Sequence, residues 1–101
     1  MSAPADPFEL AHGYGIDIAL SDLGAAAERV RIAEYEPEGP TIRINTRALE
    51  RAADPIALAR RAVAHELYHH RERLGEVERF PDRSDRERAA DDFACELLAL
   101  Q

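Results

Sequence analysis

One long helix, bounded by a start signal and a stop signal, constrains this chain more than any other feature. Asp54 followed by Pro55 is typical of a helix N-terminus. An aspartate side chain caps free N–H groups there, and proline at the first helical position loses no hydrogen bond. Gly75 then tolerates the left-handed conformation that ends many helices. We therefore predict a helix from Pro55 to about Arg73.

The apolar residues of this helix recur at helical spacing, which predicts one face packed on a core. The stripe consists of Ile56, Ala59, Val63, Leu67 and Leu74. His70 falls inside the stripe, so we interpret it as a hydrogen-bonded core histidine.

Three segments before this helix alternate apolar with polar or small residues, as strands with one buried face do. They are Ile16–Leu20, Arg29–Ala33 and Thr41–Asn45, and the Pro- and Gly-rich residues 36–40 favour a hairpin between the last two. Together with the helices, they predict a single α+β domain with a short twisted three-stranded sheet packed on the long helix and on a C-terminal helix.

Two further helices complete the expected fold. A short one covers Phe8–His12 after a loose arm at residues 1–7, and the C-terminal one runs from near Ser84 to the end of the chain. Its apolar face holds Ala90, Phe93, Ala94 and Leu97. Cys95 lies beside that face, and we expect it to be a small buried side chain.

Composition narrows the function classes. The net charge of −7 over 101 residues disfavours direct nucleic-acid binding, which needs a basic surface to replace counterions. No apolar run is long enough to cross a bilayer. The N-terminus lacks the features of a secretory signal, and the lone Cys95 cannot form an internal disulfide. These points favour a cytoplasmic protein.

The stretch AVAHELYHH, residues 62–70, contains the pattern H-E-x-x-H at His65, Glu66 and His69. Positions i and i+4 share one face of a helix, so the two imidazoles can reach one metal ion. Glu66 projects about 100° further round and could accept a proton from metal-bound water. The competing interpretation is a solvated helix face with a Glu66–His70 pair, which contributes only about 0.2 to 0.5 kcal/mol.

A catalytic zinc usually takes three protein ligands, so a third must come from elsewhere in the chain. The downstream acids are Glu76, Glu78, Asp82, Asp85, Glu87, Asp91 and Asp92. Glu87 is the best placed of them, and Asp91, one turn further on, could orient a ligand histidine. The sequence Ser84-Asp85-Arg86-Glu87 is equally a capping box, in which Glu87 would bond the helix N-terminus. Spacing alone leaves both roles open.

The chain resembles the ImmA/IrrE family of small zinc metallopeptidases in two blocks. These are AVAHELYHH and, after it, ERAADDFACELL at residues 87–98; TIRIN at 41–45 and GYGIDI at 13–18 also match in order. Tyr68 stands where the family usually has glycine. The resemblance implies a zincin-like domain in which His65, His69 and Glu87 bind Zn²⁺ and Glu66 is the general base.

The same resemblance implies that the protein is a zinc-dependent metallopeptidase. Its substrate would be a protein or peptide, such as a transcriptional regulator, cleaved by Glu66-assisted attack of zinc-bound water. The alternative is a zinc-stabilised module that binds a partner protein without cleaving it. The sequence does not identify the substrate or the oligomeric state.

Overall fold

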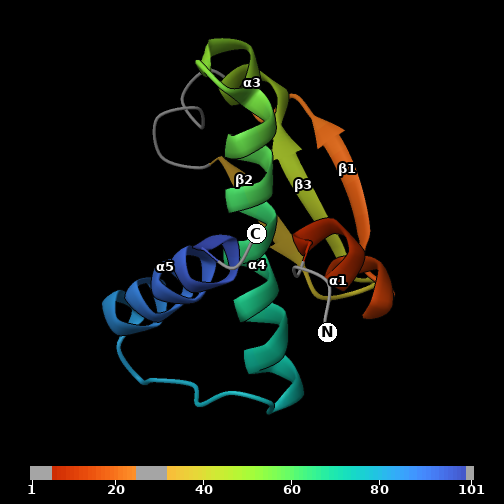
Figure 1. Cartoon of the computed structure of the whole chain (residues 1–101). Coiled ribbons are helices and arrows are strands. Elements are labelled where there is room, and N and C mark those ends of the chain that lie inside the picture. Colours follow the sequence, from red (N-terminus) through yellow and green to blue (C-terminus); the bar gives the residue numbers. More distant parts are fainter. Residues whose placement is uncertain (1–5, 25–31, 100–101) are drawn as a thin grey trace, which may run out of the picture.

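The computed structural model describes residues 6–24 and 32–99. Figure 1 shows the elements in the order α1 (Pro7–Gly13), β1 (Asp17–Ser21), β2 (Ala33–Glu36), β3 (Thr41–Asn45), α3 (Thr46–Arg51), α4 (Pro55–Leu74) and α5 (Arg83–Ala99). α4 runs through the middle of the molecule, with the sheet on one side and α5 on the other (Figure 1). The α+β class and the three-stranded sheet are thus confirmed.

The sheet is mixed, in the strand order β1-β3-β2. β3 pairs parallel with β1 and antiparallel with β2, and Ile42 is opposite Ile18 on one side and Tyr35 on the other. Residues 37–40 form the predicted hairpin turn, and Gly39 supplies a positive φ of 57°. β2 also packs against α4, the helix that carries His65 and His69.

The second strand lies later in the chain than the sequence predicted. It begins at Ala33, and the predicted residues 29–31 lie outside the described part of the chain. Ile32 is 39% exposed. Ala33 and Tyr35 face inward instead, since the two glutamates of AEYE tolerate the solvent face.

The predicted signals at both ends of α4 are confirmed. The Asp54 side chain accepts a hydrogen bond from the backbone N–H of Ala57, Pro55 is the first helical residue, and Gly75 ends the helix with a φ of 76°. α1 begins in the same way, because Asp6 caps it and the buried Pro7 starts it. Asp6 and Pro7 therefore belong to α1 rather than to the expected loose arm, whose residues 1–5 lie outside the description.

The middle of α4 carries the core. Val63 and Leu67 are fully buried against Ile42, Ile44 and neighbouring residues of the sheet and α1. Burying one such side chain stabilises the fold by roughly 1.5 to 3 kcal/mol, several times the value of a surface ion pair, so this stripe sets the rotation of the helix.

The ends of the predicted stripe are not buried. Ile56 is 73% exposed and Leu74 is 47% exposed. The sheet and α1 cover the central turns of α4, whereas these two residues lie in its first and last turns.

α5 packs on α4 through small side chains. Ala64 of α4 and Ala94 of α5 are fully buried against each other with Leu97, and Ala90 is equally inaccessible. Alanines permit a close approach of the two helices, which brings the N-terminal half of α5 over the histidines of α4. The prediction for Cys95 was wrong: it is exposed, one position beyond the packed face.

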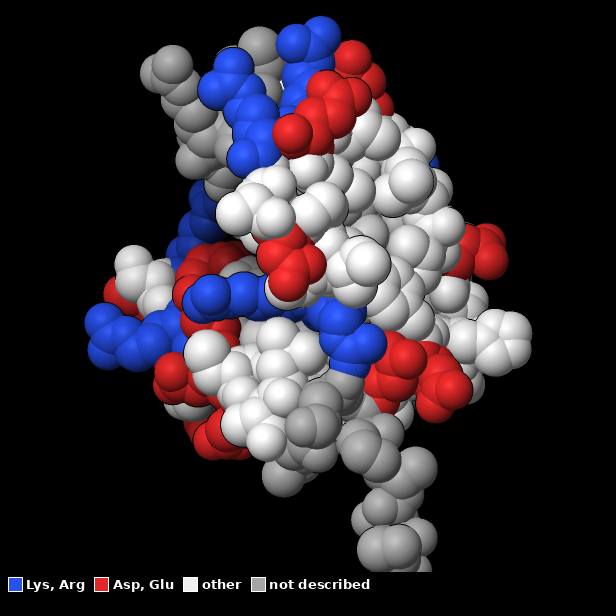
Figure 2. Space-filling model, turned by 45° about the horizontal axis from the view of Figure 1, so that its top comes forward, with Lys and Arg blue, Asp and Glu red and all other residues white. Residues whose placement is uncertain are grey.

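The surface carries charges of both signs. Figure 2 shows one face on which arginines and acidic residues lie interspersed beside a broad area without charged side chains. Among the described helices, none combines the length and the apolar character required to cross a bilayer.

Candidate metal centre

His65 and His69 lie one turn apart on α4, and both side chains are partly buried. Their ring centroids are 5.0 Å apart, and the two Nε2 atoms are 3.3 Å apart. The local i, i+4 geometry therefore directs the same atom of both rings to one point, as the sequence predicted.

α5 brings Glu87 to that point. Its Oε2 lies 2.8 Å from Nε2 of His65, and its Oε1 lies 3.4 Å from Nε2 of His69. One potential ligand atom from each of the three residues falls within 4.8 Å of the others. The structure thus assembles the three residues that the sequence analysis named as metal ligands.

The capping-box alternative for Glu87 does not describe this helix. α5 starts at Arg83, one residue before the predicted cap, and the Asp82 side chain accepts the backbone N–H of Ser84 at 2.7 Å. Asp82 therefore occupies the capping position. Glu87 then lies more than one turn inside the helix and faces the histidines.

Two further carboxylates form hydrogen bonds with the Nδ1 atoms of the two histidines, on the side of each ring away from Glu87. Asp91 Oδ1 lies 2.8 Å from Nδ1 of His65, and Glu72 Oε1 lies 2.7 Å from Nδ1 of His69. The role foreseen for Asp91 matches this contact. Glu72 was missed, although its spacing of three residues from His69 on a helix allows the contact. Its side chain is almost fully buried, and Oε2 has no hydrogen-bond partner among the described residues.

These contacts determine what the Nε2 atoms can do. An ionised carboxylate only accepts, so Nδ1 of each ring must donate its N–H to Asp91 or Glu72. In neutral imidazoles, both Nε2 lone pairs then face each other and the Glu87 carboxylate. Such a concentration of lone pairs is stabilised by a cation, or by a second proton on the rings. Two imidazole nitrogens and one carboxylate, with the outer nitrogen of each ring bonded to a carboxylate, form a group that could hold a metal ion.

Of the other acids considered as third ligands, two have different partners. Glu76 accepts a hydrogen bond from the Tyr14 hydroxyl, and Asp82 caps α5. Glu78, Asp85 and Asp92 do not line the cleft at the histidines.

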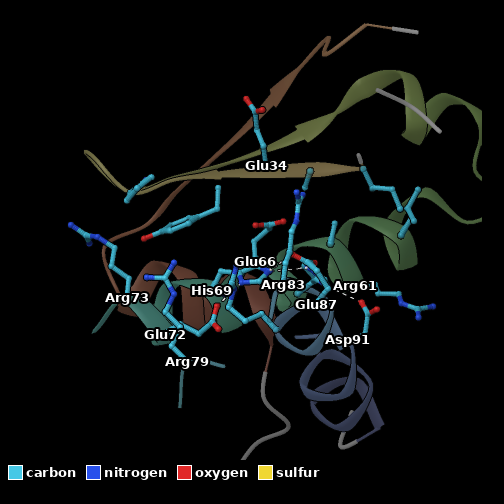
Figure 3. Close-up of a pocket in the computed structure, with 18 residues that line it drawn as sticks. Glu34, Arg61, Glu66, His69, Glu72, Arg73, Arg79, Arg83, Glu87 and Asp91 are labelled. Carbon is cyan, nitrogen blue, oxygen red and sulfur yellow. Dashed lines mark hydrogen bonds and ion pairs between the residues drawn. The ribbon is translucent and has the colours of Figure 1, made fainter. Parts of the chain in front are cut away.

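The three residues lie in a cleft of about 760 Å³ between β2, α4 and α5. Figure 3 shows the Glu66 side chain rising from α4 into this cleft, towards β2. Leu58 and Ala62 supply apolar wall, and Tyr35 lies on the opposite side. A volume of this size lies within the usual range of ligand-binding clefts in proteins.

His70, the residue after His69, is part of the core and contacts Tyr35, which lines the cleft. It is only 2% exposed, and its Nδ1 lies 2.6 Å from the hydroxyl of Tyr35 on β2. Tyr14 packs edge-on against the same ring, and its own hydroxyl donates to Glu76, which raises the pKa of Tyr14. Burial lowers the pKa of His70, with Arg73 adding to the effect. The prediction of a satisfied core histidine is confirmed.

The lowered pKa of His70 predicts acid sensitivity of the fold. Below about pH 6.5 the unfolded chain binds a proton at this residue and the folded chain does not. The free energy of unfolding therefore decreases as the pH is lowered towards the pKa of His70 in the folded chain. We expect metal-free wild type to lose more unfolding free energy between pH 8 and pH 5 than His70→Gln. Urea denaturation at each pH measures this free energy, and the two proteins differ only at residue 70. Equal losses would contradict the prediction.

The outer carboxylates should matter for metal affinity. Asp91→Asn is expected to weaken the binding of a divalent metal by about 10- to 100-fold, because an amide holds the His65 N–H less strongly and no longer fixes its tautomer. Competition with a zinc-sensitive dye measures the affinity. Asp92→Asn, which makes the same change at an exposed neighbour outside the cleft, is the control. Unchanged affinity in Asp91→Asn would show that this contact does not orient a ligand.

In comparisons with known proteins, the chain matches no family model, and no curated protein or solved structure is significantly similar to it.

Proposed function

We propose that this protein is a zinc-dependent metallopeptidase. The observation that supports the proposal most strongly is the convergence of three donor atoms, from His65, His69 and Glu87, in a cleft that Glu66 also enters. A structural zinc site would need no adjoining cleft and no fourth carboxylate beside it.

Each residue has a role that its position supports. His65, His69 and Glu87 would hold the ion, which when bound lowers the pKa of water towards 7 and polarises a carbonyl group. Glu66 accepts the proton of the attacking water and passes it to the leaving amine.

The resemblance to the ImmA/IrrE family supports the same assignment and adds the expectation of a zincin-like fold. By it, the substrate is a regulatory protein, such as a transcriptional regulator. The resemblance and the cytoplasmic location both stay predictions.

The test combines metal content with hydrolysis. We expect about one zinc per chain by elemental mass spectrometry of the purified protein. We also expect cleavage of a mixture of quenched fluorescent peptides that stops with a chelator and returns with added zinc. Bound zinc without cleavage of any peptide or candidate partner would favour the zinc-stabilised binding module. No metal after incubation with zinc would overturn both functions.

A further inference from the structure

Besides the metal ligands, arginines are the main charged groups of the cleft. Five of them line it: Arg61, Arg73, Arg79, Arg83 and Arg86. Five acidic residues also line it, so these charges balance, whereas the whole chain carries −7. The cleft is therefore far more positive than the rest of the protein, and a divalent ion would make it positive outright.

Most acidic side chains of the cleft already contact other residues, whereas most of its arginines form no hydrogen bond or ion pair with the described residues. Glu72, Glu87 and Asp91 contact the two histidines. Arg86 donates to the backbone carbonyls of Phe80 and Pro81. The remaining four, Arg61, Arg73, Arg79 and Arg83, make no hydrogen bond or ion pair with any described residue. Their guanidinium groups are available to a ligand.

The positions of two of these arginines follow from the helix. Arg61, His65, His69 and Arg73 are spaced at i, i+4, i+8 and i+12, so one face of α4 carries an arginine one turn before and one turn after the histidine pair. At 1.5 Å per residue, each is about 6 Å along the axis from the nearer histidine. Figure 3 shows Arg73 and Arg79 at one end of the cleft and Arg61 at the other, with His69, Glu66 and Glu87 between them.

We propose that the cleft selects peptides with acidic side chains on both sides of the cleaved bond. This inference rests on the proposed function and specifies its substrate. β2 and α4 run side by side along the cleft (Figure 3), so an extended peptide lying in it follows α4. An ion held by both histidines would lie between them, about 9 Å along the axis from each arginine. At about 3.3 Å per residue, this offset corresponds to roughly the third residue on each side of the scissile bond. Aspartate or glutamate there meets Arg61 at one end and Arg73 at the other.

The charge distribution favours a peptide over a nucleic acid. A short peptide inside the cleft experiences mainly charges within a Debye length, about 8 Å at physiological salt. A nucleic-acid strand extends over the surrounding surface, whose net charge is negative, and would be repelled there.

The test uses two pools of quenched fluorescent peptides, degenerate at the central positions and identical except for Asp or Asn at the third position on each side. Zinc-loaded wild type should cleave the Asp pool about tenfold faster, and added salt should reduce the preference. Arg61→Gln and Arg73→Gln should each lower the ratio of the two cleavage rates, and the double variant should bring this ratio to about one. Arg88→Gln, at an exposed position of α5 outside the cleft, should have no effect. Equal cleavage of both pools by wild type, or an unchanged preference in the double variant, would overturn the inference.

A binding measurement separates this inference from the proposed activity. Zinc-loaded Glu66→Gln is titrated into labelled, unquenched versions of the two pools, and binding is followed by fluorescence anisotropy. Tighter binding of the Asp pool, lost with Arg61 and Arg73 replaced, supports the acidic-peptide site even if no peptide is cleaved. A single-stranded oligonucleotide of equal charge that binds more tightly than the Asp pool would overturn it.

Discussion

Glu66→Gln is expected to reduce peptide hydrolysis by about 10²- to 10⁴-fold while zinc remains bound. This is the usual contribution of a positioned general base, and glutamine is nearly isosteric with glutamate but cannot accept the proton of the attacking water. The loss should appear in kcat, because the substrate still reaches the ion and the arginines. Steady-state kinetics on one cleaved peptide and zinc content by mass spectrometry provide the two measurements.

The matched control for this variant is Glu96→Gln, which removes the same charge at an exposed position of α5 outside the cleft. It should behave as wild type. Retained activity in Glu66→Gln would remove the base assignment, and loss of zinc from it would make Glu66 a ligand instead.

The part of the site that lies within one helix could be predicted from sequence. His65 and His69 are four residues apart, and the helix that carries them is bounded by Asp54, Pro55 and Gly75, whose effects are local. Helical periodicity alone then places both imidazoles on one face.

Glu87 could not be selected in the same way. Its distance from His65 depends on how α5 crosses α4, and that crossing is set by close contact of Ala64 with Ala94, thirty positions later in the sequence. Local rules even favoured a different role, because Ser84 and Glu87 have capping-box spacing. Asp82 provides the cap instead and leaves Glu87 available.

The sheet illustrates the same limit. The hairpin of β2 and β3 follows from a proline- and glycine-rich turn, but the parallel pairing of β1 with β3 has no local signal, because parallel strands are joined through a long connection. The sequence alone predicted the wrong inward-facing residues in the second strand. Val30 and Ile32 alternate with other residues just as Ala33 and Tyr35 do. Only the packing of Ala33 and Tyr35 with the core selects between the two alternatives.

Glu87→Ala is expected to weaken zinc binding by at least about a hundredfold, more than the loss of an outer carboxylate, since it removes a direct ligand. His69→Ala should have a comparable effect. Zinc at a hundred times its dissociation constant stabilises a folded protein by about 2.7 kcal/mol, so wild type should show a clear rise in melting temperature with zinc and Glu87→Ala should not. Dye competition and thermal unfolding with and without zinc measure both effects.

Asp82→Ala, compared with Glu87→Ala, distinguishes the two roles considered for Glu87, metal ligand and helix cap. Because Asp82 caps α5, this variant should lose about 0.5 to 2 kcal/mol of stability without metal and keep its zinc affinity. Glu87→Ala should show the reverse: lost affinity and nearly unchanged metal-free stability. If Glu87→Ala instead destabilised the metal-free protein and left zinc binding intact, Glu87 would support the helix rather than the ion. The ligand set would then have only two histidines, too few for a catalytic zinc.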